Sequence, residues 1–219
     1  MPKTPVIIDC DPGHDDAMAL MLALASPELE VVAVTTVAGN QTLDKVTANA
    51  IRVLDVVDAH DVPVAAGADR PLVHNTARVA DEVHGETGLD GPDLPPPSRD
   101  PERIHAVELM ARELRKRPLT LIPVGPLTNI ALLLATHPEL TAQIERVVIM
   151  GGAIGLGNVT PSAEFNIWVD PEAAEVVFTS GVPITLCGLD VTHQALATPE
   201  VLARLAGVST PLARTGSAT

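Results

Sequence analysis

The sequence of 219 residues has almost no aromatic side chains and no long apolar segment. Its aromatic residues are two phenylalanines and one tryptophan, with no tyrosine, so the core has to be built from aliphatic side chains. No apolar run approaches the roughly 18 residues that a membrane-spanning helix needs, and no signal peptide opens the chain. We therefore expect a protein without a membrane partner.

Basic residues are scarce as well, at 14 against 28 acidic ones, which gives a net charge of −14. A surface of this sign repels phosphate backbones and argues against a nucleic-acid partner. The two cysteines, Cys10 and Cys187, are far apart in apolar, strand-like surroundings, and we expect both to be buried free thiols in a reducing cytoplasm.

Short apolar runs alternate with helical patterns along the chain. We expect strands at 6–9, 31–38, 63–67, 119–124, 146–150 and 183–189, and helices at 15–25, 42–57, 103–116, 127–136, 171–180 and weakly from 199. Such alternation predicts an α/β fold: a mostly parallel open sheet with helices on both faces, Rossmann-like in arrangement, as one domain over 1–219. The long segment 68–101 lacks periodicity, which is typical of a functional or mobile loop.

Four carboxylates follow the first predicted strand. Asp9 and Asp11 lie on one face of the strand end, and Asp15 and Asp16 open the next helix. Their mutual repulsion would be relieved by a hard divalent cation, and the lack of a cysteine or histidine spacing typical of zinc sites favours calcium or magnesium. The alternative is that each acid only caps a helix or anchors a turn, which is credible for one residue but less so for all four.

Polar side chains also follow the other predicted strands, where ligands bind in parallel sheets. Carboxylates and amides suit the vicinal hydroxyls of a sugar. Asn40 and Asn158 follow glycines, so each is equally well explained as a turn residue, and Asp170-Pro171 is better explained as a helix N-terminus. The set consists of Asn40, His84, Glu86, Asn158, Glu164, Asn166, Asp190 and Thr192.

Together these motifs resemble the inosine-uridine preferring nucleoside hydrolase family, and most of all its pyrimidine-specific branch. The resemblance runs from Val6 to about Gln194 and implies that family's fold and activity: hydrolysis of the N-glycosidic bond of ribonucleosides, uridine and cytidine first, with Ca²⁺ as cofactor and a homodimer or homotetramer as the assembly. The matching motifs are DCDPGHDDAMAL, AGNQT, VHGETGLDG, VGPLTNIALLL, VVIMGGA, AEFNIWVDPEAAE and GLDVTHQ.

The resemblance also implies a role for individual residues. Asp11, Asp16 and the carbonyl oxygen of Val124 would bind calcium, Asp11 would be the general base for the attacking water, and Asp9 would support the metal site from behind. His84 would lie near the base. The ribose would be held by Asp15, Asn40, Met150, Asn158, Glu164 and Asn166.

The family also carries a His-Asp pair after a further strand, and no such dipeptide follows Gln194. We therefore expect a C-terminally incomplete domain, a calcium site short of one carboxylate, and weak or no turnover by the 219-residue form.

Two other functions fit part of the pattern. A protein that binds nucleoside or ribose without turnover would use the same polar groups. A phosphatase of the haloacid dehalogenase type also places Asp-x-Asp after its first strand, as in Asp9-Cys10-Asp11, but the Pro-Gly-His-Asp-Asp that follows argues against it.

Overall fold

The computed structural model describes residues 2–91 and 94–207. Their strands form one six-stranded sheet in the order β3-β2-β1-β4-β5-β6, and every neighbouring pair is parallel. The fold predicted from strand–helix alternation is thereby confirmed. The strands are β1 (Thr4–Cys10), β2 (Leu29–Thr36), β3 (Val64–Ala66), β4 (Leu119–Pro123), β5 (Ile144–Met150) and β6 (Ile184–Cys187).

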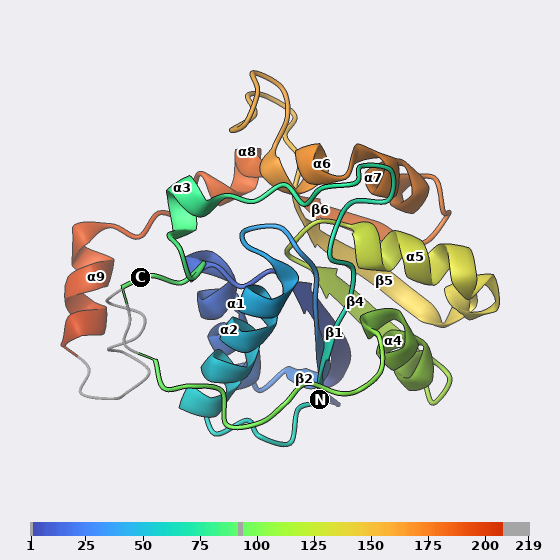
Figure 1. Ribbon diagram of the computed structural model, residues 1–219, viewed down its shortest axis with the longest axis horizontal. Coiled ribbons are helices and arrows are strands. Elements are labelled where there is room, and N and C mark those ends of the chain that lie inside the picture. Colours follow the sequence, from blue (N-terminus) through green and yellow to red (C-terminus); the bar gives the residue numbers. More distant parts are fainter. Residues whose placement is uncertain (1, 92–93, 208–219) are drawn as a thin grey trace.

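Helices cover both faces of this sheet (Figure 1). One face carries α1 (His14–Ala25) and α2 (Leu43–Val56), which pack on Val6 and Ile8, whereas Ile7 points into the core of the other face. That alternation follows from the two-residue period of a strand. The other face carries α4 (Ala106–Leu114), α5 (Thr128–Thr136) and α7 (Pro171–Phe178).

Five shorter helical segments connect or follow these elements. They are α3 (Asp81–His84), the 3₁₀ segment η1 (Pro138–Gln143), α6 (Phe165–Val169), α8 (Leu189–Thr192) and α9 (Pro199–Ala206). None of the first four was predicted, because one or two turns contain too few residues to display a helical period. The residues after Gly207 lie outside the described part of the chain.

The cysteine prediction is right for one residue and wrong in part for the other. Both cysteines are free, and Cys10 is buried, but Cys187 is only partly buried because β6 lies at the edge of the described sheet. Among the described residues, no helix is both long and apolar enough to cross a bilayer.

The order of strands positions the site. From β1 the chain runs outward to β2 and β3, and it then returns to the other side of β1 to form β4, β5 and β6. The loops that leave β1 and β4 therefore diverge, and a crevice for ligands opens between the carboxyl ends of these two strands. Asp11 follows β1 and Val124 follows β4, so both lie at this crevice.

Candidate active site

Asp11 is fully buried at the end of β1 and is enclosed by backbone. Its Oδ2 accepts a hydrogen bond of 2.6 Å from the amide of Asn40. A Cβ atom at Gly39 would lie 2.1 Å from Oδ2, and one at Gly125 would lie 2.4 Å from Oδ1. Only glycine allows the backbone to approach a carboxylate this closely. Oδ1 has no hydrogen-bond partner in the described structure.

Asp16 lies in the first turn of α1 and is also buried, with an exposed fraction of 3%. Its Oδ2 accepts from Nδ2 of Asn40 at 3.2 Å, and the same Nδ2 donates to the backbone oxygen of Asp11 at 3.0 Å. Oδ1 of Asp16, like Oδ1 of Asp11, has no described partner. Asn40 therefore joins two buried acids, each with one free oxygen.

Burial and repulsion disfavour charge on these acids. Burial raises the pKa of Asp11 well above its usual value, and the charge of Asp16 raises it further. Burial likewise raises the pKa of Asp16, with Asp15 adding to the effect. For Asp9, burial raises the pKa to about 6 although hydrogen bonds from Thr35 and Asn129 lower it. A nearby positive charge would stabilise the ionised forms.

The oxygen atoms available here suit a hard divalent cation, although they are few. The free oxygens of Asp11 and Asp16 are the ligand type that calcium and magnesium prefer. The carbonyl oxygen of Val124 accepts a 2.8 Å hydrogen bond from Nδ2 of Asn166 and keeps a second lone pair. Within residues 2–91 and 94–207, however, no three His, Cys, Asp or Glu side chains gather as a metal site.

A cavity of about 250 Å³ opens at the crevice. All seven residues that the resemblance implies for the ribose or the base line it, together with Asp16 and Val124. Asp11 does not line the cavity, because it is buried behind Asn40, and the other candidates outside the lining are Asp9, Glu86, Asp190 and Thr192. Four lining residues were not predicted, and all of them are apolar: Ala80, Val83, Val159 and Phe165.

One wall of the cavity is a hydrogen-bonded unit around Glu164, Asn166 and Met150. The carboxylate of Glu164 caps α6 by accepting from the amide of Asn166 at 3.0 Å, and it also accepts from the amide of Gly152 at 2.8 Å. Nδ2 of Asn166 donates to the carbonyl oxygens of Val124 and Met150 at 2.8 and 3.1 Å. These bonds fix Glu164 and Asn166 before any ligand arrives, which is the preorganisation that a binding site requires.

Another part of the lining comes from the segment that lacks periodicity. The short helix α3 places Val83 and His84 against the cavity. Burial lowers the pKa of His84 below its usual value. His14 contacts His84 with a ring-centroid separation of 5.4 Å. A functional role for this part of 68–101 fits these positions.

Asn158 lies on the loop between β5 and α6, which projects from the sheet in Figure 1. The backbone of Asn158 belongs to a turn, because its amide donates to the carbonyl of Ala163 at 3.0 Å. The residue nevertheless lines the cavity. Asp190 anchors the loop by accepting from the amides of Ile154 and Gly155 at 2.6 and 3.1 Å.

The N-cap predicted at Asp170 is confirmed. Its carboxylate accepts from the amide of Ala173 at 3.0 Å and from Oγ1 of Thr128 at 2.7 Å, and Pro171 is the first residue of α7. Sequence reasoning missed Asn129, whose fully buried side chain bonds Asp9. The signal was present in the motif GPLTN, where an asparagine enters a helix directly after a strand end.

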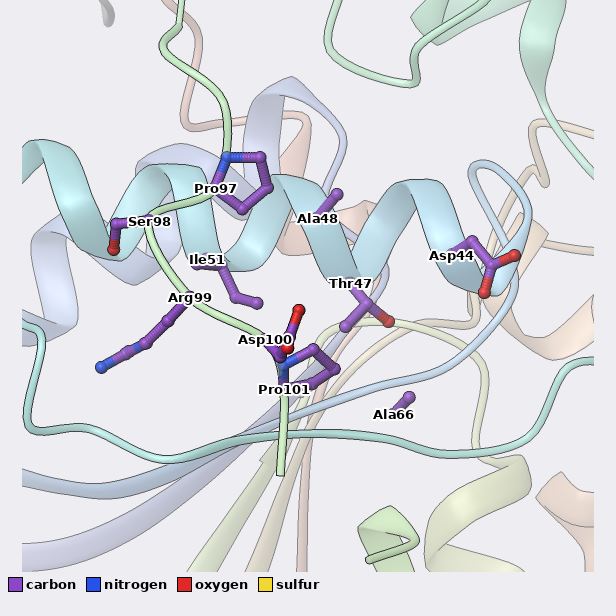
Figure 2. A pocket seen from close by; sticks show the side chains of 10 residues that line it. All are labelled: Asp44, Thr47, Ala48, Ile51, Ala66, Pro97, Ser98, Arg99, Asp100 and Pro101. Atoms are coloured by element: carbon purple, nitrogen blue, oxygen red, sulfur yellow. The ribbon is translucent and has the colours of Figure 1, made fainter. Parts of the chain in front are cut away.

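A second, more open cavity of about 590 Å³ lies between α2 and the segment 97–101 (Figure 2). It contains none of the predicted site residues, and its walls include Thr47, Ile51 and Pro101. Size alone would favour it, but the smaller cavity has the buried acids and the convergent polar groups that characterise a site for chemistry.

Comparisons with known proteins identify the family of this chain. A sequence profile of inosine-uridine preferring nucleoside hydrolases matches residues 6–218. Pyrimidine-specific ribonucleoside hydrolases of Shewanella oneidensis and Photobacterium profundum are 62% and 59% identical to this chain over 212 residues, which is 96% of it. The chain belongs to the inosine-uridine preferring nucleoside hydrolase family, and the resemblance in its motifs is confirmed.

Solved structures give the same fold. A plant nucleoside hydrolase superimposes with a TM-score of 0.93 at 38% identity, covering 99% of this chain and 70% of that one. A purine-preferring ribonucleoside hydrolase from Gardnerella vaginalis superimposes with a TM-score of 0.92 at 34% identity, covering 97% and 70%. The chain spans 66% of the length of the Shewanella oneidensis relative.

Proposed function

We propose that this chain hydrolyses the N-glycosidic bond of ribonucleosides, giving free base and ribose, at the cavity between β1 and β4. The observation that carries the proposal is the convergence on one cavity of the residues implied for ribose binding, beside two buried acids with free oxygens. Membership of the nucleoside hydrolase family supports the same reaction.

Asp11, Asp16 and the carbonyl of Val124 would hold a calcium ion in this proposal. A cation bound there supplies positive charge that makes a nearby water more acidic. Asp11 would be the general base for that water, which is the role that the family resemblance implies for it. The enclosing glycines and the amide of Asn40 keep that carboxylate in one orientation.

The polar wall of the cavity would bind the ribose. Asp15, Asn40, Met150, Asn158, Glu164 and Asn166 surround the space where the sugar hydroxyls would lie. Positive charge develops on the ribose ring as the glycosidic bond breaks, and the acids at this wall stabilise it. His84 would contact the base or the neighbouring part of the nucleoside.

We further propose that pyrimidine nucleosides are preferred. The support is 59–62% identity to relatives named pyrimidine-specific, against 34% for the purine-preferring neighbour. The specificity of such enzymes depends on contacts to the base. Ribose release from uridine and from inosine, compared at equal enzyme concentration, tests this preference, and faster release from inosine would contradict it.

The first test of the activity is ribose release from uridine by this chain, with calcium and then with a chelator. Calcium-dependent release supports the proposal. If calcium and uridine raise the thermal midpoint without releasing ribose, the chain binds nucleoside without turnover, and the catalytic part of the proposal is wrong. Equal release with chelator would contradict the role of the cation.

We also propose a homodimer or homotetramer that works in the cytoplasm. The support is the family assignment and the two free cysteines, which suit a reducing compartment. Light scattering on the purified chain tests the assembly, and a monomer at micromolar concentration would contradict it.

A further inference from the structure

His14 connects the acidic N-terminus of α1 to the loop that contains His84. It is the first residue of α1, next to Asp15. Its Nε2 lies 2.8 Å from the carbonyl oxygen of Asp90, and its Nδ1 lies 3.3 Å from Nδ1 of His84. The two imidazole rings stack with an interplanar angle of 29°. Each nitrogen of His14 therefore has a defined partner.

The partner of Nε2 determines one proton position on His14, and the second follows for a neutral ring. A carbonyl oxygen can only accept, so Nε2 of His14 must carry the proton that it shares with Asp90. In a neutral imidazole the other nitrogen is then an acceptor. With His14 in its neutral form, Nδ1 of His14 accepts and Nδ1 of His84 donates. A neutral His84 with its proton on Nδ1 has its lone pair on Nε2.

The Asp90 carbonyl is held firmly enough to impose this choice. The carboxylate of Asp90 accepts from the amides of Glu86 and Thr87 at 3.0 and 3.1 Å, which closes the loop on itself. The carbonyl of Thr87 accepts from Nδ2 of Asn49 on α2 at 2.9 Å. The loop is thus tied to α2 by Asn49 and to α1 by His14.

We propose that His14 is a positioning residue that holds His84, which lines the cavity, in the Nδ1-protonated tautomer, so that Nε2 is left as the hydrogen-bond acceptor of the His84 ring. The ligand group that it would recognise is an N–H or O–H donor. The identity of that ligand as a nucleoside rests on the proposed function, whereas the pairing of the two histidines does not.

The test is long-range ¹H–¹⁵N correlation on the full chain with ¹⁵N-labelled histidine, because ¹⁵N shifts separate protonated from unprotonated ring nitrogens. The wild-type spectrum should show His14 protonated on Nε2 and His84 protonated on Nδ1. A His84 protonated on Nε2 alone, or a His14 protonated on Nδ1, would overturn the proposal.

Two substitutions separate the hydrogen bond from the ring stacking. His14→Asn keeps an acceptor near the position of Nδ1 but removes the ring, and His84 should stay protonated on Nδ1. His14→Phe keeps the ring but removes the acceptor, and His84 should lose this tautomer. The opposite pattern, or no change in His14→Phe, would contradict the proposal. His60→Asn, at an exposed histidine paired with Asp55, is the control and should leave His84 unchanged.

Adding uridine to the labelled wild-type chain distinguishes this inference from the proposed function. A shift of the Nε2 resonance of His84 supports its role as an acceptor for the ligand. An unshifted Nε2 with the expected tautomers would contradict the nucleoside assignment of the cavity and leave the histidine pairing confirmed.

Discussion

Nδ2 of Asn129 donates a 2.8 Å hydrogen bond to Oδ1 of Asp9 across 120 residues of chain. Both side chains are buried, and Nδ2 also donates to the carbonyl of Thr36 at 2.9 Å. Oδ1 of Asn129 accepts from the amide of Ala68 at 2.9 Å. One asparagine at the start of α5 thus joins the ends of β1, β2 and β3, behind the predicted metal site.

We expect Asn129→Ala to lower the free energy of unfolding by about 3 kcal/mol, because it leaves buried polar groups without partners. Urea denaturation at pH 7 measures the effect. Asn75→Ala, at an exposed asparagine, is the matched control and should change stability by less than about 0.5 kcal/mol. Equal effects of the two substitutions would show that the network around Asp9 is not important for the fold.

Gly125→Ala should abolish cation binding while leaving the chain folded. The new Cβ would lie 2.4 Å from Oδ1 of Asp11, so that carboxylate has to move. In the unaltered chain, calcium at about 100 times its Kd should stabilise by about 2.7 kcal/mol. Thermal midpoints with and without calcium measure this stabilisation.

Gly207→Ala is the control for that substitution, since the nearest atoms to its Cβ would be 3.4 Å away. It should keep the calcium-induced rise. A Gly125→Ala chain that calcium stabilises as strongly as the original would contradict the role of Asp11 as a ligand.

Asp190→Ala should release the loop that carries Asn158. The hydrogen bonds from the amides of Ile154 and Gly155 hold the pKa of the Asp190 carboxyl below its usual value, so the anchor is ionised at neutral pH. Removing it should speed hydrogen exchange of these two amides by on the order of tenfold. Exchange measured by mass spectrometry tests this, with Glu200→Ala on α9 as the control. Unchanged exchange at 154–155 would show that Asp190 is not the anchor.

Asp55 gives a prediction about pH. Burial raises its pKa, but hydrogen bonds from the hydroxyl and amide of Ser98, together with His60, lower it to below its usual value. A depressed pKa stabilises the fold above the unfolded-state pKa of about 3.9, and the stabilisation disappears as pH falls through the folded-state pKa. The difference in unfolding free energy between the original chain and Asp55→Asn should be larger at pH 6 than at pH 3.5. A constant difference would contradict this assignment.

The sheet was predictable because buried parallel strands appear as continuous apolar runs separated by amphipathic helices. Strand ends were also predictable, and with them the crevice at which Asp11, Asn40 and Val124 meet. The short helices α3 and α6 were not, because they are too short for a repeating pattern and α6 also depends on tertiary contacts such as the hydrogen bond that Glu164 accepts from the amide of Gly152.

The roles of individual site residues could be assigned only through the family motifs. The alternation of strands and helices says nothing about whether Asn158 is a turn residue or a cavity residue, and the structure assigns it to both. The contact between His14 and His84 joins residues 70 positions apart, and no sequence motif relates the two. Contacts of this kind follow from the packing of a loop on a helix, which a single sequence does not display.

The most direct test of the central claim is ribose release from uridine, with calcium, by Asp11→Asn and Asp44→Asn measured side by side. Asp11 lies beside the proposed active site, whereas Asp44 lines the other cavity. We expect Asp11→Asn to lower the rate by about a thousandfold through loss of the general base, and Asp44→Asn to keep the original rate. Equal rates in the two variants, or a loss confined to Asp44→Asn, would contradict the assignment of the active site.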